Sequence, residues 1–266
     1  GYLCKAERIR RPVCVEWRGG GGRSMKERPI LFSGAMVRAI LDGRKTQTRR
    51  ICKPAEKAAL SFVTAIQDPS DYGQRPLEIP GSGWFGDEDG DVQFYCPYGR
   101  PGDRLWVRET YYAFGRWVTR YSAKKRRDEW HFIDMTLECD RAYQYAADEP
   151  DVPLAKDRGS VLPGWWLRPA IFMPRAAARV VPDVMGSRVE RLNDCSEEDA
   201  IAEGIAPHYS GWWPYRTAFY ESDGVTPANF HRDPRESYRS LWDSINGAGA
   251  WAANPWVWVV EFRRAD

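Results

Sequence analysis

The first clear pattern along the chain is a short apolar run followed by a helical period. Residues 29–32 (PILF) predict a strand, and Ser33 directly after them is suited to cap a helix. One face of that helix is apolar and consists of Met36, Val37, Ile40 and Leu41. Gly43 fits the left-handed position that ends a helix. The basic stretch 43–50 (GRKTQTRR) therefore follows a helix and leads into a second strand.

Two more helices and a closing strand are marked near the end of the chain. Ser196 and Asp199 have the spacing of a capping box, and Gly204 ends the short helix that they begin. Residues 236–247 (ESYRSLWDSING) are amphipathic with a helical period, and residues 254–264 (NPWVWVVEFRR) predict a strand.

Strands outnumber helices in this pattern, which predicts an α+β fold: a small mixed β-barrel with short flanking helices. Residues 1–24 contain a run of four glycines and are expected to be a disordered leader, or a mobile basic arm that touches nucleic acid. Residues 25–266 are expected to form a single domain. Three segments rich in loop-forming or charged residues predict insertions near 54–98, 113–165 and 206–235.

Composition narrows the functional classes. The chain has 266 residues and a net charge of only +2, so contacts with nucleic acid would depend on local clusters of charge. Thirteen tryptophans are more than a core can bury with satisfied N–H groups, so some are expected to line a pocket or a binding face.

The cysteines and histidines argue against a metal site. Six cysteines are widely spaced without a CxxC pair, and the three histidines are far apart, so we expect no metal, no cofactor and no disulfide scaffold. Apolar runs are too short to span a membrane. These features predict a soluble cytoplasmic protein with reduced thiols and no membrane partner.

The stretch 43–50 holds the first candidate chemistry. Thr48 becomes a nucleophile only if a base takes its proton, and Lys45 can be that base only if burial lowers its pKa. A charged Lys45 would instead stabilise an oxyanion. The alternative is a solvated basic turn followed by an ordinary strand threonine.

Two further groups add candidates. Glu203 falls in the last turn of its predicted helix, where the helix dipole disfavours an anion, so a cationic partner such as Lys45 is expected. The predicted strand 104–112 places Trp106 and Arg108 on one face, next to Glu109. An indole and a guanidinium side by side suit base stacking and phosphate binding. A covered tryptophan and a surface ion pair are the alternative.

These residues also carry a resemblance. The segments GRKTQTRR, PGDRLWVRE, ERLNDCSEEDAIAEGI and NPWVWVVEF occur here in that order, and together they resemble the ASCH domain family of the PUA-like superfamily, more narrowly its phage- and prophage-encoded members. Gly43, Lys45, Thr48 and Arg50 match the family signature G-x-K-x-x-T-x-R. The similarity extends from about Met25 to Phe262.

The resemblance implies a small β-barrel whose cleft accepts RNA or a modified nucleobase, in a bacterial or phage-infected cell. One enzymatic branch of the family hydrolyses N4-acetylcytidine to cytidine and acetate. Its catalytic lysine and threonine match Lys45 and Thr48 by motif, and its catalytic glutamate, in a helix of the same type, best matches Glu203. Substrate contacts are expected from Arg44, Arg50, Trp106, Arg108 and Glu109. This chain is much larger than that branch, so a non-catalytic module that binds RNA or a modified base is the alternative.

Overall fold

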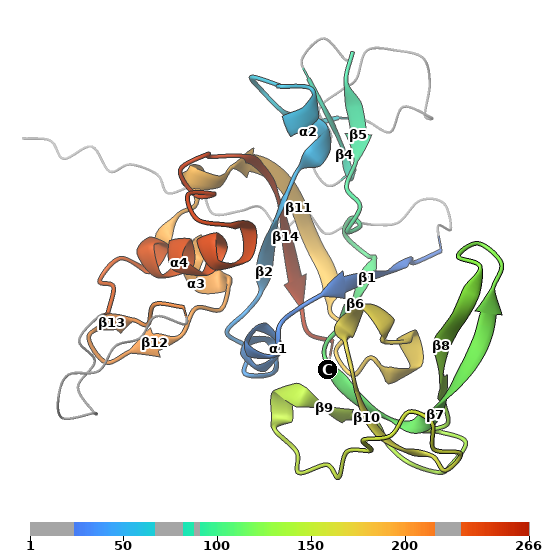
Figure 1. The fold of residues 1–266 in the computed structure, drawn as a ribbon. Coiled ribbons are helices and arrows are strands. Elements are labelled where there is room, and N and C mark those ends of the chain that lie inside the picture. Colours follow the sequence, from blue (N-terminus) through green and yellow to red (C-terminus); the bar gives the residue numbers. More distant parts are fainter. Residues whose placement is uncertain (1–23, 67–81, 88–90, 216–229, 266) are drawn as a thin grey trace, which may run out of the picture.

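The structure is a computed structural model that describes residues 24–66, 82–87, 91–215 and 230–265. The predicted leader lies outside these residues except for Ser24, as do parts of the insertions expected near 54–98 and 206–235. Most of the described secondary structure is β-sheet with a few short helices (Figure 1). The α+β class expected from the sequence is thus confirmed.

The principal sheet has five strands in the order β1-β6-β11-β14-β2. Their bounds are β1 Glu27–Leu31, β6 Arg104–Arg108, β11 Asp183–Arg191, β14 Trp256–Arg263 and β2 Gln47–Ile51. Strands β1 and β6 are parallel, whereas β11, β14 and β2 pair in antiparallel fashion. The closing segment of the sequence therefore forms a central strand, which agrees with its nearly continuous apolar run.

The closed barrel expected from the sequence is not found among the described residues. Strands β1 and β2 are the two edges of an open sheet. Where a barrel would pair them, a side chain makes the connection: Arg50 Nη2 on β2 donates to the Leu31 carbonyl at 2.9 Å. Phe32 lies beside this junction, since the Arg50 guanidinium is 5.3 Å from its ring centroid. Side chains thus occupy the space in which a backbone ladder would close.

In the described part of the chain, four α-helices flank the principal sheet: α1 Gly34–Leu41, α2 Lys53–Lys57, α3 Glu197–Ala202 and α4 Pro234–Asn246. The predicted caps are confirmed. The Ser33 side chain accepts the N–H of Met36, and both hydrogen bonds of the Ser196–Asp199 capping box are present. Helix α3 packs against both α4 and β2, so these three elements form one corner of the molecule (Figure 1).

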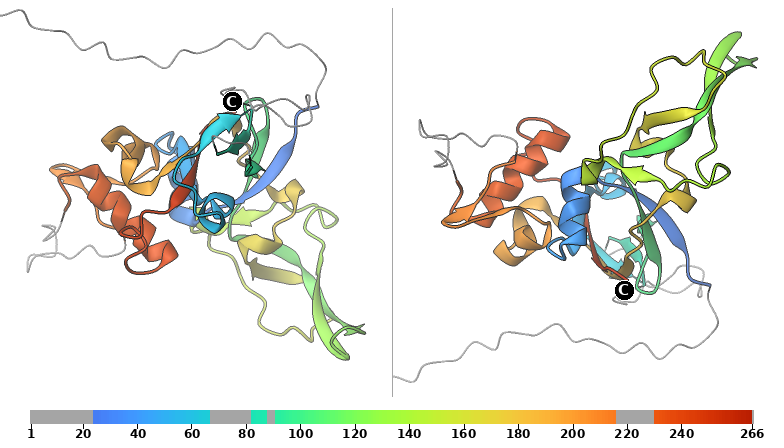
Figure 2. Two further views of the ribbon diagram at one scale, coloured as in Figure 1. Left: turned by 90° about the horizontal axis from the view of Figure 1, so that it is seen from above. Right: turned by 90° about the horizontal axis from the view of Figure 1, so that it is seen from below.

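A second sheet extends away from this corner (Figure 2). Its strands are β7 Tyr111–Ser122, β8 Arg127–Asp134, β10 Gly164–Arg168 and β9 Gln144–Tyr145, in the order β10-β7-β8 with β9 paired to β7. The segment 113–165, which the sequence analysis treated as an insertion, therefore has regular structure. The long β7–β8 hairpin points away from α3 and α4 (Figure 1).

The remaining elements are short. Two small sheets comprise β3 Thr64–Ile66, β4 Trp84–Gly86 and β5 Gln93–Tyr95, and β12 Pro207–His208 with β13 Gly211–Trp212. Turns of 3-10 helix are η1 Ala146–Asp148, η2 Ala170–Phe172, η3 Arg175–Ala177 and η4 Leu192–Asp194.

The main core lies between the principal sheet, α1, α4 and the β3–β4–β5 sheet. Trp258 of β14 is fully buried and is met edge-on by Phe85 and Phe94, with ring centroids 5.0 and 5.7 Å away. Leu105 and Val107 of β6 are buried as their alternation predicts. A well-packed central strand holds β2, and with it the basic stretch 43–50, in a defined register.

Candidate functional site

The basic stretch is held against the end of helix α3. Lys45 forms an isolated antiparallel bridge with Glu203, and the N–H of Thr46 donates to the Ala202 carbonyl at 2.9 Å. The backbones approach closely at Gly204, which has a φ of +84°, and a Cβ added there would lie 2.7 Å from Cβ of Lys45. A glycine is therefore required at this position for the two segments to meet.

The Lys45 ammonium is enclosed and fully hydrogen-bonded. Its Nζ donates to the carbonyls of Gln47 at 2.9 Å and Glu203 at 2.8 Å, and to Oε2 of Glu203 at 2.8 Å. An ammonium has three donors, so these acceptors use all of them. Burial lowers the pKa of Lys45, and the nearby Glu203 carboxylate acts in the opposite direction.

Glu203 has the cationic partner that its position at the C-terminal end of α3 predicts. Besides Lys45, its other carboxylate oxygen accepts from Nη1 of Arg49 at 3.3 Å. Arg49 also pairs with Glu190 at 2.7 Å and Asp199 at 2.9 Å, and its side chain is fully buried. These five residues form what we call the buried ion network. It fastens β2 to β11 and α3.

Thr48 lies apart from this network. The residue is fully buried and pairs with Val260 of β14, and its hydroxyl has no hydrogen-bond partner. It forms no hydrogen bond with Lys45, and it lines neither of the two cavities described below. Lys45 and Glu203 are thus brought together, whereas Thr48 is sealed in the sheet.

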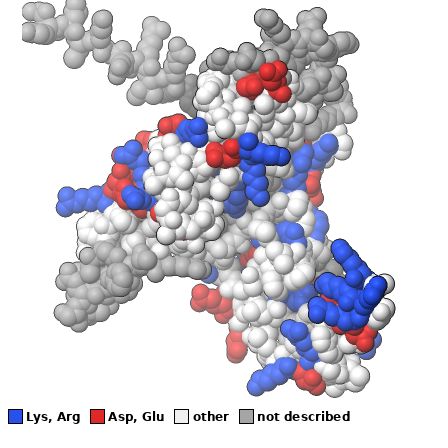
Figure 3. Space-filling view, turned by 45° about the horizontal axis from the view of Figure 1, so that its top comes forward, with Lys and Arg blue, Asp and Glu red and all other residues white. Residues whose placement is uncertain are grey.

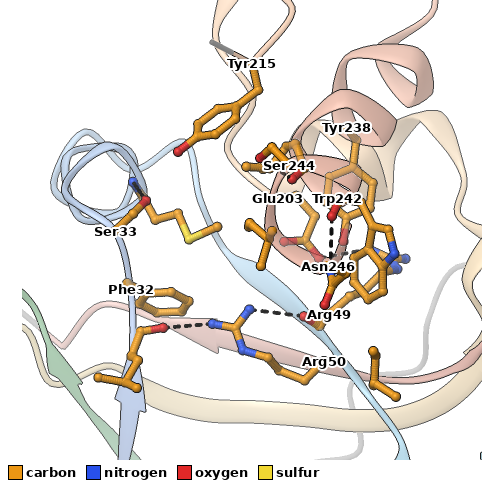
Figure 4. Close-up of a pocket in the computed structure, with 15 residues that line it drawn as sticks. Phe32, Ser33, Arg49, Arg50, Glu203, Tyr215, Tyr238, Trp242, Ser244 and Asn246 are labelled. Atoms are coloured by element: carbon orange, nitrogen blue, oxygen red, sulfur yellow. Dashed lines mark hydrogen bonds and ion pairs between the residues drawn. The ribbon is translucent and has the colours of Figure 1, made fainter. Parts of the chain in front are cut away.

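A cavity of about 400 Å³ opens beside Glu203, between α1 and α4 (Figure 4). We call it the α1–α4 cavity. Aromatic side chains form much of its wall: Phe32, Tyr215, Tyr238 and Trp242. Its polar and aliphatic lining comprises Leu31, Ser33, Met36, Arg49, Arg50, Ile51, Glu203, Leu241, Ser244, Ile245 and Asn246. Lys45 is absent from this lining, but its Nζ pairs with Glu203 and lies 5.4 Å from the ring centroid of Phe32, and both of these residues line the cavity.

Arg50 is the cation with free capacity in this cavity. Its guanidinium donates to the carbonyls of Leu31 and Arg49, and it has no carboxylate partner in the described part of the chain. A guanidinium has five N–H donors, so several remain for a ligand. Trp242 is 4% exposed and its indole N–H is buried without a partner. The cavity thus offers donors on an aromatic wall, together with the Glu203 carboxylate.

A neighbouring cavity of about 330 Å³ is also lined by Glu203. The two share Met36, Glu203, Tyr215 and Leu241. Arg44, a predicted substrate contact, lines this second cavity. Its Nη1 donates to the carbonyls of Gly204 and Ile205 at 3.1 and 3.4 Å, and it pairs with Asp42. Arg44 therefore hydrogen-bonds backbone carbonyls just after the C-terminal end of α3.

The predicted group on β6 lies elsewhere. Trp106, Arg108 and Glu109 line neither cavity, although the Arg108 guanidinium is 5.4 Å from the Trp106 ring as the shared strand face predicts. Glu109 is buried and pairs with Arg179 at 2.9 Å. The structure does not bring this group to the site beside Glu203.

Sequence reasoning missed the aromatic wall. Tyr238 and Trp242 belong to the apolar face of the helix predicted over 236–247, and both are buried there as expected. The same face also lines a cavity, which an apolar helical period cannot show. Phe32 is the last residue of the strand predicted over 29–32, and nothing in that apolar run marks it as part of a cavity wall.

No group of His, Cys, Asp or Glu side chains suited to a metal ion occurs in the described residues. Within the same ranges, no helix has the length and apolar character needed to cross a membrane. The four cysteines in the described ranges are free thiols. Comparisons with protein-family models, curated proteins and solved structures each returned no match. The resemblance to the ASCH domain family therefore stays a prediction from sequence motifs.

Proposed function

We propose that this protein binds a modified cytidine or a related nucleoside in the α1–α4 cavity. One observation carries the proposal: a cavity of about 400 Å³ combines aromatic walls, a guanidinium at Arg50 without a carboxylate partner in the described residues, and a carboxylate at Glu203. This volume falls within the roughly 300–1,000 Å³ typical of small-molecule sites.

The chemistry of cytosine suits these groups. Its ring stacks on aromatic side chains, and O2 and N3 accept hydrogen bonds that a guanidinium such as that of Arg50 can donate. The amino group at N4 donates, and the Glu203 carboxylate has acceptor capacity beyond the two cations it already binds. A pocket with both a donor and an acceptor distinguishes bases by their polar edges.

Binding without chemistry is the form of this proposal that the geometry favours. A nucleophilic Thr48 would have to reach the substrate, and its hydroxyl is buried outside both cavities. Removal of an N4-acyl group is the second candidate. It is favoured by the lowered pKa of Lys45 beside Glu203, because a lysine needs such a shift to act as a base.

Calorimetric titration of the full chain with cytidine, N4-acetylcytidine, uridine and adenosine tests the proposal. We expect a cytidine derivative to bind, and Arg50→Ala to weaken it by about tenfold or more, since a hydrogen bond to a charged group contributes roughly 1.5–3 kcal/mol. Arg50→Lys keeps the charge but loses the planar fork, so it should retain part of the affinity.

Arg263→Ala is the matched control, because Arg263 is an exposed arginine of the same sheet and lines neither cavity. Failure of all four nucleosides to bind, or equal affinity in Arg50→Ala, would overturn the proposal. Mass spectrometry of N4-acetylcytidine after incubation decides between the two forms. Release of acetate that disappears in both Thr48→Ala and Lys45→Ala would establish the hydrolase.

A further inference from the structure

The β7–β8 hairpin carries a row of aromatic side chains on one of its faces. Residues paired directly across antiparallel strands point to the same side of a sheet. Trp117 is paired with Phe132, and Trp130 and Tyr121 follow on the same side toward the tip, because Trp130 pairs with Thr119 and Tyr121 lies two residues further along β7. Trp166 of β10 joins this side at the base, where it meets Trp117 edge-on, with ring centroids 6.0 Å apart. We call these five side chains the aromatic face.

The aromatic face is open to solvent toward its tip. Tyr121 is 68% exposed and Trp130 is 45% exposed. At the base, Trp117 contacts the Phe132 ring edge-on at 5.3 Å, and its indole N–H is buried without a partner. Large aromatic groups left in water on a projecting ribbon add nothing to a core, so they point to an occupant. A row of rings at successive strand positions suits successive planar groups.

Cations surround this face. Arg158 and Arg168 each lie 4.7 Å from the Trp117 ring centroid. Six more cations lie on the hairpin itself. Lys124, Lys125 and Arg126 belong to its tip, whereas strand alternation places Arg116, Arg120 and Arg127 on the face opposite the aromatic one.

The hairpin carries three carboxylates, Asp128, Glu129 and Asp134. Asp134 lies at its base and accepts hydrogen bonds from the Thr136 and Tyr143 hydroxyls. Glu129 forms ion pairs with Lys125 at 2.7 Å and Arg127 at 3.5 Å. Asp128 lies opposite Tyr121 on the aromatic face. The other four hairpin cations have no ion pair within the ranges that the structure describes. Figure 3 shows lysines and arginines gathered on the lobe that projects from the body of the protein.

We propose that the aromatic face of the β7–β8–β10 sheet binds single-stranded RNA, with the basic hairpin tip holding its phosphates. Aromatic side chains stack on unpaired bases, and cations beside them neutralise the backbone. An acidic peptide would use the cations but would leave the rings uncovered, and a duplex would hide the bases from them. The choice of RNA over DNA rests on the proposed function, because the α1–α4 cavity is proposed to take a ribonucleoside.

Fluorescence anisotropy of the full chain with a labelled single-stranded RNA of about 12 nucleotides tests this site. We expect Trp130→Ala and Tyr121→Ala each to weaken binding by about fivefold or more, since one base–aromatic stack contributes roughly 1–3 kcal/mol. In the double variant Lys124→Ala/Arg126→Ala, log affinity should fall less steeply with log salt concentration. The magnitude of the slope should decrease by about 1.4, because each phosphate contact to a single strand contributes about 0.7.

Tyr209→Ala is the matched control: Tyr209 is an 83% exposed tyrosine in the turn between β12 and β13, away from the hairpin (Figure 1). The Tyr209→Ala variant should bind RNA with the same affinity as the wild type. Unchanged affinity in Trp130→Ala and Tyr121→Ala, or equal binding of a duplex, would overturn the stacking site. Equal affinity for single-stranded DNA would overturn the assignment to RNA.

Arg50→Ala separates this proposal from the proposed function. The Arg50 side chain contacts the Leu31 and Arg49 carbonyls and the Phe32 ring, all at the α1–α4 cavity. An RNA without modified bases should therefore bind the variant as tightly as the wild type. Loss of nucleoside binding together with intact RNA binding would uphold both sites as distinct. Loss of RNA binding in Arg50→Ala would place the RNA in the cavity and overturn the hairpin site.

Discussion

Replacing Glu203 with glutamine should expose how much the buried ion network depends on one charge. Glutamine keeps the size and the hydrogen-bonding ends of the side chain but removes its charge. Arg49 would still pair with Glu190 and Asp199, at 2.7 and 2.9 Å. The Lys45 ammonium would have no carboxylate left, since Glu203 is its ion-pair partner in the described structure. The loss therefore falls mainly on Lys45.

The magnitude follows from what Lys45 can do in response. Breaking a buried ion pair typically costs about 3–5 kcal/mol. Loss of the Lys45 proton sets an upper bound to this cost. Its ordinary pKa is 10.5, so a neutral Lys45 at pH 7 costs about 5 kcal/mol at roughly 1.4 kcal/mol per pH unit. We expect Glu203→Gln to lower the free energy of unfolding by about 3–5 kcal/mol, which is a large share of the roughly 5–15 kcal/mol of a typical domain.

This response has a pH signature. A Lys45 that is neutral when folded and protonated when unfolded makes the unfolded state bind the extra proton, so stability rises with pH. The deficit of Glu203→Gln relative to the wild type should shrink by up to about 1.4 kcal/mol per unit between about pH 7 and pH 9. Lys45→Met/Glu203→Gln has no ammonium and should show no such change.

Urea unfolding followed by tryptophan fluorescence at several pH values measures these differences. Glu198→Gln is the control, because Glu198 is an exposed glutamate of the same helix. It should change the free energy of unfolding by no more than about 0.5 kcal/mol. If Glu203→Gln were as stable as the wild type at pH 7, with the same pH dependence, the idea that this carboxylate holds the Lys45 charge would be wrong.

Three further predictions concern neighbouring residues. Thr48→Val should raise the free energy of unfolding by about 1 kcal/mol, because it replaces a buried hydroxyl that has no partner; a lower midpoint in urea would contradict this. Asp199→Asn should be less stable than the wild type at pH 7 but approach it below about pH 4. Burial raises the pKa of Asp199, but the hydrogen bond from Gln47 and the charge of Arg49 outweigh burial and hold the pKa below 3.8. The stabilisation by the ionised carboxylate is therefore lost as the pH falls through the folded-state pKa. Arg44→Ala should lower the melting temperature while nucleoside affinity in calorimetry stays unchanged, because Arg44 binds the Gly204 and Ile205 carbonyls outside the α1–α4 cavity.

Local structure was predictable from the sequence where local chemistry decides it. The Ser33 cap, the left-handed Gly43 with a φ of +74° and the Ser196–Asp199 capping box depend on residues a few positions apart. The pairing of Lys45 with Glu203 joins residues that are 158 positions apart. The pairing was expected because a glutamate at the C-terminal end of a helix is disfavoured by the helix dipole and needs a cationic partner. That signal is local in the sequence, although the partner is distant.

Closure of the sheet and the position of the 106–109 group were not predictable in this way. Whether β1 and β2 pair depends on the side chains between them, and Phe32 with Arg50 occupies that junction. Strand alternation correctly placed Trp106 and Arg108 on the less buried side of β6. It cannot show which other elements lie beside that side, and so it could not show that these residues lie away from Glu203. The α1–α4 cavity likewise depends on how far apart two helices pack.

Neighbouring residues of the basic stretch have opposite environments. Arg49 and Arg50 are consecutive on β2, so their side chains leave the strand on opposite sides. One is fully buried among three carboxylates, and removing it would break the structure before any ligand was involved. The other is partly exposed and has no carboxylate partner among the described residues. Both arginines line the cavity, but only the second has donors free of an ion pair there. The motif therefore combines a structural arginine with one that is free to bind, so Arg50 is the position at which binding can be altered without breaking the buried ion network.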